Sequence, residues 1–260
     1  MISVQPTQTK ADIFNRIIVF TYGVFSYAIF FVTIIYTAGF LGNIFVPKSI
    51  DSTPQSPLLS ALLINGGLLG LFAIQHSVMA RQGFKQWWTK FINKAAERST
   101  YVLFSSLALM FLFWQWQPIG GVIWNIQNQV GQLMLWLLFG IGWLILFLST
   151  FLINHFDLFG LRQVYLYLQG KEYTQLKFKT PWLYNYVRHP LYVGWLLIFW
   201  STPKMTAAHL VFALLTTIYI LVAIQFEERD LINIYGEAYT TYRQRVPMLI
   251  PFRKKQHSLK

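Results

Sequence analysis

The sequence predicts an all-α integral membrane protein with five to six transmembrane helices, the last of which form a C-terminal helical hairpin. Of the 260 residues, 55% are hydrophobic and only 12% are charged, which is about half the charged share of an ordinary soluble domain. The 58 residues between Arg98 and Asp157 carry no formal charge. Uncharged apolar runs of 18 or more residues are typical of membrane spans, so a soluble globular protein and a disordered chain are both excluded.

Each helix follows from one of these runs, because a crossing needs about 20 residues. The 58-residue run is too long for one crossing, and the polar stretch from Gln115 to Gln132, which contains Gly120-Gly121, predicts a turn within it. Pro203 divides the last run into the two arms of the hairpin. The chain is thus one polytopic domain over residues 1–260. The predicted helices cover about residues 15–39, 58–80, 100–116, 131–153, 190–202 and 206–228, followed by an amphipathic cytoplasmic segment over 229–252.

The basic residues predict the orientation. If the N-terminus is cytoplasmic, the cytoplasmic segments hold 19 of the Lys and Arg residues, and the opposite face holds only Lys48 and Lys204. Because Lys and Arg collect on the cytoplasmic side of membranes, both termini are expected there. The net charge of +12 is therefore attributed to topology and to the lipid surface, and no nucleic-acid partner is expected.

Polar residues in four separate segments are predicted to reach the membrane at one depth, near the cytoplasmic face. Ionisable groups at membrane depth are candidates for function, since removing them from water is costly. No cysteine occurs, so a disulfide, a thiolate metal site and a cysteine nucleophile are all excluded. The residues concerned are His76, His155, Asp157, Arg188, His189, Glu227 and Glu228.

The segment from Arg188 to Gly194 has the clearest local chemistry. Pro190 suits the first turn of a helix, which puts Arg188 and His189 just ahead of the helix N-terminus, where free N–H groups and the dipole favour an anion. Gly194 allows a ligand or a second backbone to approach closely. A ligand that carries a carboxylate would fit this corner.

The complementary feature lies at the end of the hairpin. Glu227 and Glu228 are adjacent carboxylates that require a cation nearby, such as Arg229 or an ammonium or sulfonium group on a ligand. Gly236 is typical of a helix stop. Tyr239 and Tyr242 follow at i, i+3 spacing and would share one face of a short helix that closes a cytoplasmic pocket.

These residues together resemble the membrane methyltransferases related to isoprenylcysteine carboxyl methyltransferase and to the phospholipid methyltransferases. The family pattern is Arg-His-Pro-x-Tyr-x-Gly, a helical hairpin, Glu-Glu, Gly-x-x-Tyr-x-x-Tyr and Val-Pro. Here it is matched by residues 188–194, Glu227-Glu228, Gly236, Tyr239, Tyr242 and Val246-Pro247. Residues 75–81, 96–101 and 154–163 extend the resemblance to the branch of methanethiol S-methyltransferases, and NnrU-type proteins share part of this upstream pattern.

The resemblance implies S-adenosylmethionine as the cofactor and methanethiol, or a similar small thiol, as the substrate, with dimethyl sulfide as the product. It implies a bacterial inner-membrane protein whose hairpin forms the cofactor site. No metal is required by this chemistry. The cofactor-binding residues that it implies are Arg188, His189, Tyr192, Gly194, Glu227, Glu228, Tyr239 and Tyr242.

A thiol must lose its proton, because the thiolate is the nucleophile. His76, His155 and His189 are candidate bases, with Asp157 able to orient an imidazole; the choice among the three stays open. Asp157 can equally pair with Arg162 as a structural ion pair. The tyrosines can equally be interfacial anchors.

Two other functions fit parts of the pattern. A related methyltransferase would act on a lipid or on a prenylcysteine carboxylate, for which a wide lateral opening between helices is expected, whereas methanethiol would suit a small closed pocket. Alternatively, His76 and His155 on neighbouring helices could ligate a haem in an electron-carrying or NnrU-like membrane protein. A transporter is less favoured, because the sequence shows no repeated broken helices.

Overall fold

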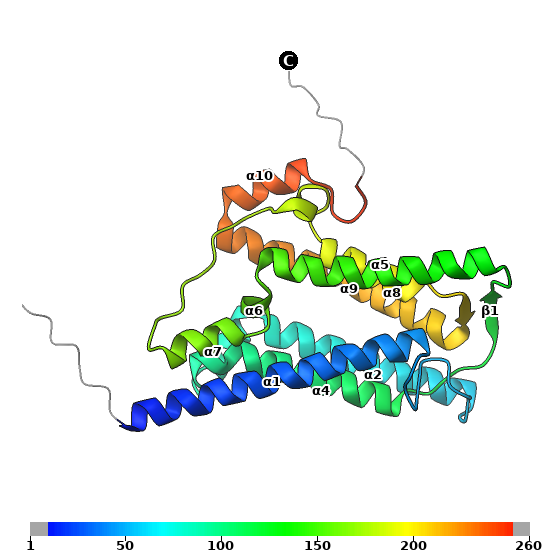
Figure 1. Cartoon of the computed structure of the whole chain (residues 1–260), viewed down its shortest axis with the longest axis horizontal. Coiled ribbons are helices and arrows are strands. Elements are labelled where there is room, and N and C mark those ends of the chain that lie inside the picture. Colours follow the sequence, from blue (N-terminus) through cyan, green and yellow to red (C-terminus); the bar gives the residue numbers. More distant parts are fainter. Residues whose placement is uncertain (1–9, 252–260) are drawn as a thin grey trace, which may run out of the picture.

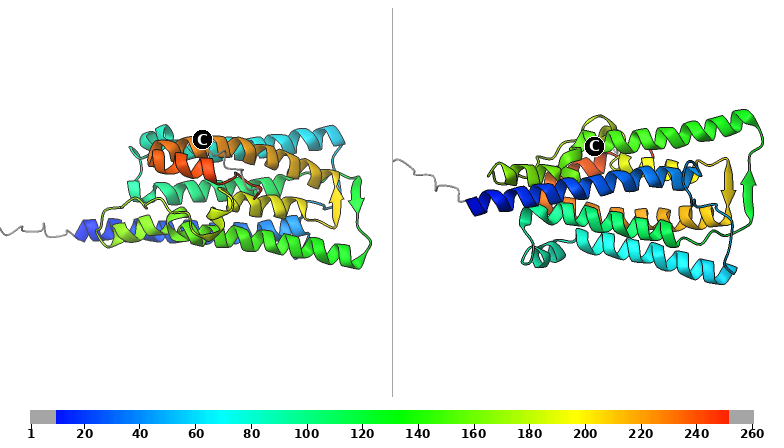
Figure 2. Two further views of the ribbon diagram at one scale, coloured as in Figure 1. Left: turned by 90° about the horizontal axis from the view of Figure 1, so that it is seen from above. Right: turned by 60° about the horizontal axis from the view of Figure 1, so that its bottom comes forward.

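The computed structural model describes residues 10–251, in which six helices run side by side along the longest axis of the molecule (Figure 1). In Figures 1 and 2, α1, α2 and α4 form one layer, and α5, α8 and α9 form a second layer. Within the layers α1 and α2 pack on α4, and α5 and α9 pack on α8. The six helices are α1 (Lys10–Gly42), α2 (Leu58–Ala80), α4 (Glu97–Gln115), α5 (Gln129–Ile153), α8 (Pro190–Trp200) and α9 (Ala207–Tyr235).

Shorter elements cover the two ends of this bundle. One end carries α3 (Gln82–Trp88), η1 (Lys94–Ala96), α6 (His155–Leu158), α7 (Leu161–Leu168), η2 (Trp182–Asn185) and α10 (Glu237–Arg245). The opposite end carries an antiparallel pair of short strands, β1 (Val122–Asn125) and β2 (Lys204–Thr206), with a bulge between Val122 and Trp124.

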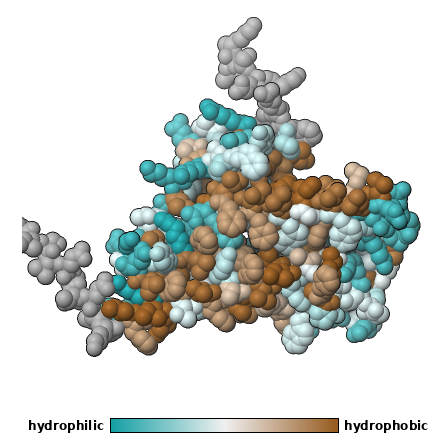
Figure 3. All heavy atoms as spheres, in the orientation of Figure 1, coloured by the Kyte–Doolittle hydropathy of each residue, from teal (hydrophilic) through white to brown (hydrophobic). Residues whose placement is uncertain are grey.

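Four helices are long and apolar enough to cross a membrane by length and composition: residues 12–42 of α1, together with α2, α5 and α9. Large apolar side chains are exposed along them, including Leu63, Leu137 and Ile218. Figure 3 shows the hydrophobic surface over the middle of the molecule and hydrophilic residues gathered toward its two ends. The molecule is therefore an all-α membrane protein, with one small sheet among its described residues.

The predicted helix positions agree with most of these elements. The turn within the long uncharged run is confirmed, and α8 begins at Pro190 as expected. The predicted end of the hairpin helix at residue 228 was wrong, because α9 continues through Glu227-Glu228 to Tyr235. The helix stop predicted at Gly236 is confirmed, with φ at +57°. The predicted segment 229–252 is thus divided between α9, α10 and a non-helical stretch, and residue 252 lies outside the described residues.

A close contact between backbones holds α8 against α5. A Cβ on Gly194 would lie 2.8 Å from the carbonyl oxygen of Gly142 and 2.8 Å from the amide nitrogen of Leu146. Because neither atom can move without the helix that carries it, position 194 requires glycine. The side chains of Leu146 and Ile198 fill the remainder of this contact and belong to the main apolar core.

Candidate active site

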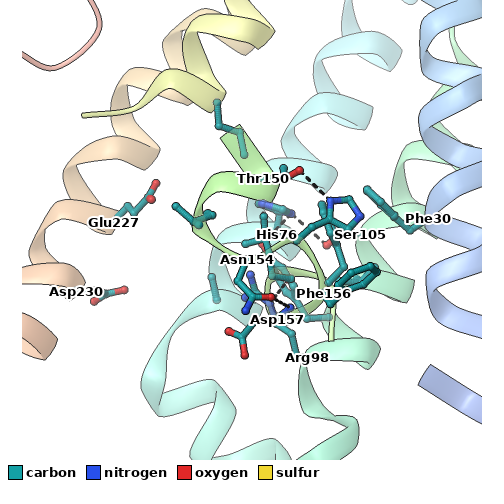
Figure 4. Close-up of a pocket in the computed structure, with 18 of the residues that line it drawn as sticks. Phe30, His76, Arg98, Ser105, Thr150, Asn154, Phe156, Asp157, Glu227 and Asp230 are labelled. Carbon is teal, nitrogen blue, oxygen red and sulfur yellow. Dashed lines mark hydrogen bonds between the residues drawn. The ribbon is translucent and has the colours of Figure 1, made fainter. Parts of the chain in front are cut away.

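A large cavity of about 2200 Å³ lies between the two helix layers. Charged side chains line it at the end that carries α6, α7 and α10, and apolar side chains such as Phe113 and Phe212 line its interior. Figure 4 shows Glu227 and Asp230 on one wall and His76, Arg98 and Asp157 across from them. Residues from nearly every helix therefore meet at this cavity.

Arg188 and Glu228 form a buried ion pair at the junction of α8, α9 and α10. The Arg188 Nε atom donates to Glu228 Oε1 at 2.6 Å, and both side chains are less than a tenth exposed. Arg188 Nη1 also donates to the carbonyl oxygens of Arg243 and Val246, at 3.1 and 2.6 Å. His189 Nε2 lies 3.0 Å from the same Glu228 oxygen. Arg188 and Glu228 therefore neutralise each other, and the Arg188 side chain ties the hairpin to the segment after α10.

This arrangement corrects the prediction of an anion site at the start of α8. The N–H groups of Arg188 and His189 donate to the carbonyl oxygens of Pro247 and Met248, at 2.9 and 3.2 Å. The N–H of Tyr192 donates to the His189 carbonyl. The chain itself thus uses three of the N–H groups that were expected to receive a ligand carboxylate. The sequence correctly predicted that Arg188, His189 and the two glutamates lie close together. It did not predict that Arg188 pairs with Glu228.

Glu227 is in a different environment from its neighbour. Its side chain is 44% exposed, lines the cavity and accepts a hydrogen bond from the Tyr192 hydroxyl at 2.9 Å. Its Oε2 atom lies 4.0 Å from His189 Nδ1. No Lys or Arg within the described chain pairs with Glu227, so its negative charge is available to a cationic ligand in the cavity.

Tyr239 and Tyr242 share a face of α10, as the spacing predicted, and both line the cavity. Tyr242 donates to the Tyr184 carbonyl at 2.6 Å, whereas the Tyr239 hydroxyl is buried and has no partner among the described residues. Burial raises the pKa of both phenols above their usual range, so both remain neutral donors. Gly194, by contrast, does not line the cavity; the close neighbour expected there is the α5 backbone and not a ligand.

His76 also lines the cavity, on α2 (Figure 4). Its Nε2 atom lies 2.7 Å from the Tyr101 hydroxyl, and its Nδ1 atom lies 3.1 Å from Ser105 Oγ. Phe72 stacks on the ring with centroids 5.2 Å apart. The imidazole is therefore held in one orientation by groups from α2 and α4.

His155 and Asp157 lie close in sequence but have separate partners. His155 is buried, with its Nε2 atom 2.8 Å from the Tyr27 hydroxyl and its Nδ1 atom 2.9 Å from Thr150 Oγ1. Asp157 instead accepts from Arg162 Nη1 at 2.8 Å and from the Tyr173 hydroxyl at 3.3 Å. The structure thus shows the structural ion pair, and among the described residues Asp157 orients no imidazole.

The haem hypothesis is not supported by these contacts. Both ring nitrogens of His155 have hydrogen-bond partners within the protein, so His155 presents no free nitrogen to a haem iron. No cluster of three or more potential metal ligands occurs in residues 10–251.

Sequence reasoning missed the side chains of α4 that face His76. Tyr101 and Ser105 both contact His76, and the Arg98 guanidinium lies over the Tyr101 ring, 4.9 Å from its centroid. The signal was the i, i+4 spacing of Tyr101 and Ser105, which places both on one face of a helix. It becomes informative only when the histidine is known to lie opposite.

Comparison with known proteins agrees with this architecture. Residues 136–238, which include α8 and all of α9 with Glu227, match the phospholipid methyltransferase family. Together with the membrane helices, this match indicates a membrane-bound methyltransferase. No solved structure gives a significant match.

Relatives that match almost the whole chain indicate which kind of membrane methyltransferase this is. A methanethiol S-methyltransferase from Crocosphaera subtropica is 66% identical over 95% of this chain and 98% of its own. One from Mycobacterium tuberculosis is 51% identical over 92% of this chain and 98% of its own. The chain belongs to the methanethiol S-methyltransferase family. Nurim from Bos taurus is a more distant relative, 32% identical over 67% of this chain and 69% of its own.

Proposed function

We propose that this protein transfers the methyl group of S-adenosylmethionine to methanethiol and releases dimethyl sulfide. The observation that carries the proposal is the 66% identity over 95% of the chain to a methanethiol S-methyltransferase. The large cavity, with a free carboxylate at one wall and a hydrogen-bonded histidine at another, supports it.

The side chains at the charged end of the cavity fit S-adenosylmethionine, which supplies an electrophilic methyl group on a sulfonium. Glu227 offers an unpaired carboxylate to its ammonium or sulfonium charge. The buried hydroxyl of Tyr239 lacks a protein partner and lines the same cavity, and buried polar groups normally have one. We therefore assign Glu227, Tyr192, His189 and Tyr239 to the cofactor site, with Tyr242 in its wall.

Arg188 and Glu228 act on this site indirectly. Their ion pair fixes the start of α8 against α9 and the residues after α10. Breaking a buried pair leaves an uncompensated charge and costs about 3–5 kcal/mol. These two residues therefore position the cofactor site.

Among the three histidines, His76 is the proton acceptor that the contacts favour. It lines the cavity across from Glu227 (Figure 4). His155 and His189 line the same cavity, but His155 has a hydrogen-bond partner on each ring nitrogen and stacks on Phe151, and His189 is bonded to Glu228. Proton transfer to a positioned side chain typically accelerates a reaction by about 10²–10⁴.

The proposed topology has six crossings in the inner membrane of a bacterium, with both ends of the chain in the cytoplasm. Beyond the four long spans, α4 and α8 run between the same two ends of the molecule (Figure 1). α8 has only 11 residues, and the extended residues 201–206 complete its path to the sheet. The charged end of the cavity would then open to the cytoplasm, as the 19 basic residues predict.

Headspace gas chromatography on the purified protein tests the proposed function. Dimethyl sulfide is expected when S-adenosylmethionine and methanethiol are both present, and none is expected when either is omitted. Absence of product from a preparation that binds S-adenosylmethionine would contradict methanethiol as the acceptor. Absence of both product and binding would contradict the methyltransferase.

The volume of the cavity favours a second candidate acceptor. At about 2200 Å³ it exceeds the roughly 300–1000 Å³ of most small-molecule pockets, and methanethiol is very small. A phospholipid or a prenylcysteine carboxylate would use this space. Methylated lipid extracted from reactions without methanethiol would support that candidate.

A further inference from the structure

Phe72 divides the part of the cavity that lies along α2. Leu69, Phe72 and His76 all line the cavity, and their spacing of three and four residues places them on one face of the helix. Toward the end of α2 the lining continues to Arg81 at the charged end, whereas Leu69 belongs to the main apolar core, as does Phe113 across from it on α4. Phe72 therefore stands between His76 and the apolar interior of the cavity.

Aromatic rings from three helices pack together at this position, and all of them line the cavity. Phe72 stacks on His76 with ring centroids 5.2 Å apart, and Tyr219 on α9 packs edge-on against both rings, at 6.2 and 6.5 Å. The Tyr101 ring on α4 lies 4.9 Å from the imidazole. The Tyr219 hydroxyl is held by Ser77 Oγ at 3.3 Å. Because each ring packs against another, Phe72 is not free to swing aside.

The same rings leave the Nε2 atom of His76 without a partner in the plane of the imidazole. The Tyr101 hydroxyl lies 2.7 Å from Nε2 and 3.1 Å from Nδ1, which places it over the face of the ring. Nδ1 has Ser105 Oγ at 3.1 Å (Figure 4). Among residues 10–251 no further group lies within hydrogen-bond distance of Nε2, so an S–H group in the cavity can donate to it.

We propose that Phe72 is a specificity-determining residue, which limits the acceptor to thiols of about the size of methanethiol. The inference rests on the proposed function and adds where its acceptor binds, with the sulfur at His76 Nε2 and the methyl group against Phe72. Sulfur and methyl groups suit a polarizable aromatic surface. A longer alkyl chain bound at the same nitrogen has to extend toward Leu69, and the Phe72 ring blocks that path. A cavity of about 2200 Å³ thus selects a very small acceptor.

Phe72→Ala opens this path, and Phe104→Ala is the matched control, since Phe104 on α4 is 45% exposed and does not line the cavity. The measured quantity is kcat/KM for 1-hexanethiol divided by kcat/KM for methanethiol, from gas chromatography of the methyl thioethers formed with S-adenosylmethionine. For Phe72→Ala we expect this ratio to rise about 100-fold or more, because each methylene that a pocket admits is worth about tenfold or more. Phe104→Ala should keep the wild-type ratio within about twofold.

The ratio distinguishes a change of specificity from a loss of structure. A variant that is only destabilised loses activity with both thiols in proportion, so its ratio stays at the wild-type value. Partition of hexanethiol into detergent is the same for every variant and cancels when their ratios are compared. Phe72→Leu retains an apolar side chain in the core and should give a ratio between those of the wild type and Phe72→Ala. It therefore tests the proposal even if Phe72→Ala does not fold.

Three results would overturn the role of Phe72: a wild-type protein with similar kcat/KM for both thiols, a wild-type ratio in folded Phe72→Ala or Phe72→Leu, or an equal rise of the ratio in Phe104→Ala. In each of these cases the wild-type protein still forms dimethyl sulfide, so the proposed function would stand. Failure of the wild-type protein to form dimethyl sulfide would overturn the role of Phe72 together with the proposed function.

Discussion

Two adjacent glutamates show how burial separates chemical roles at the scale of the residue. The Glu228 side chain is 7% exposed and neutralised by Arg188, whereas the Glu227 side chain is 44% exposed and faces the cavity. Tyr192 donates to Glu227 and fixes its direction. Adjacent residues on a helix point about 100° apart, so one carboxylate joins the core while the next serves the ligand.

Replacing Glu227 by Gln should weaken S-adenosylmethionine binding while the fold persists. The amide keeps the size of the side chain but removes its charge, and a hydrogen bond to a charged group contributes about 1.5–3 kcal/mol. We expect the dissociation constant, measured by isothermal titration calorimetry in detergent, to rise about tenfold or more. Glu237→Gln, an exposed change on α10 outside the cavity, is the control. Equal affinities in the two variants would remove Glu227 from the site.

His155 makes the stability of the protein depend on pH. Burial lowers its pKa from the ordinary value of 6.5, so the folded state binds a proton less readily than the unfolded state. Its stabilising contribution is complete above pH 6.5 and is lost as the pH falls through the lowered value. Between pH 7 and pH 5 the midpoint of thermal unfolding should therefore fall more in the wild type than in His155→Gln. Parallel pH dependence in both proteins would count against this role.

At this scale the sequence identified most residues of the site but not their partners. Arg188, His189 and Glu228 were predicted to lie together, and they do. Their partners include the carbonyl oxygens of Arg243 and Val246, which belong to a segment with no apolar periodicity. Such backbone acceptors exist at every position, so no residue pattern marks them.

At the scale of the element, the contact between α5 and α8 brings two helix backbones close together beside the site. Gly194→Ala would place a Cβ 2.8 Å from backbone atoms of α5, and overpacking of this kind costs about 1–3 kcal/mol. We expect a lower midpoint of thermal unfolding in detergent. Gly140→Ala is the control, since its added Cβ would meet no atom within 4 Å and alanine favours helix. A destabilisation no larger than in that control would contradict the contact.

Helix positions could be predicted where hydrophobic runs and helix-breaking residues define them, as for α2 and for the start of α8 at Pro190. The end of α9 was misjudged, because two charged residues at a membrane boundary were interpreted as the end of a helix. Helices extend beyond the membrane without penalty, so only Gly236 ends this one. The strands β1 and β2 are four and three residues long and pair across 78 or more residues of sequence, so no local pattern revealed them.

At the scale of the whole molecule, the absence of cysteine from the sequence makes the topology measurable. Gln86 in α3 and Gln127 between β1 and α5 are both exposed, and these elements cover opposite ends of the bundle. In intact cells, an impermeant maleimide should label Gln127→Cys, while Gln86→Cys should react only after the membrane is opened. The unsubstituted protein is the control for background labelling. The reverse pattern would place the charged end of the cavity outside the cytoplasm.

The cavity itself is a property of the whole molecule and could not be predicted. Its lining comes from segments as distant as Ile34 on α1 and Tyr242 on α10, and its volume depends on how far the two layers stand apart. Membrane helices expose apolar side chains to lipid as well as to one another, so hydrophobicity does not reveal which faces pack. The sequence therefore indicated the chemistry of the site but not its size.

The central claim is that methyl transfer from S-adenosylmethionine to methanethiol takes place in this protein. It is tested most directly by supplying the purified protein with methyl-deuterated S-adenosylmethionine and unlabelled methanethiol, and by analysing the headspace with gas chromatography and mass spectrometry. We expect dimethyl sulfide with one deuterated and one ordinary methyl group, formed by the wild type and at a much lower rate by Glu227→Gln. Unlabelled dimethyl sulfide, or label found only in extracted lipid, would contradict the claim.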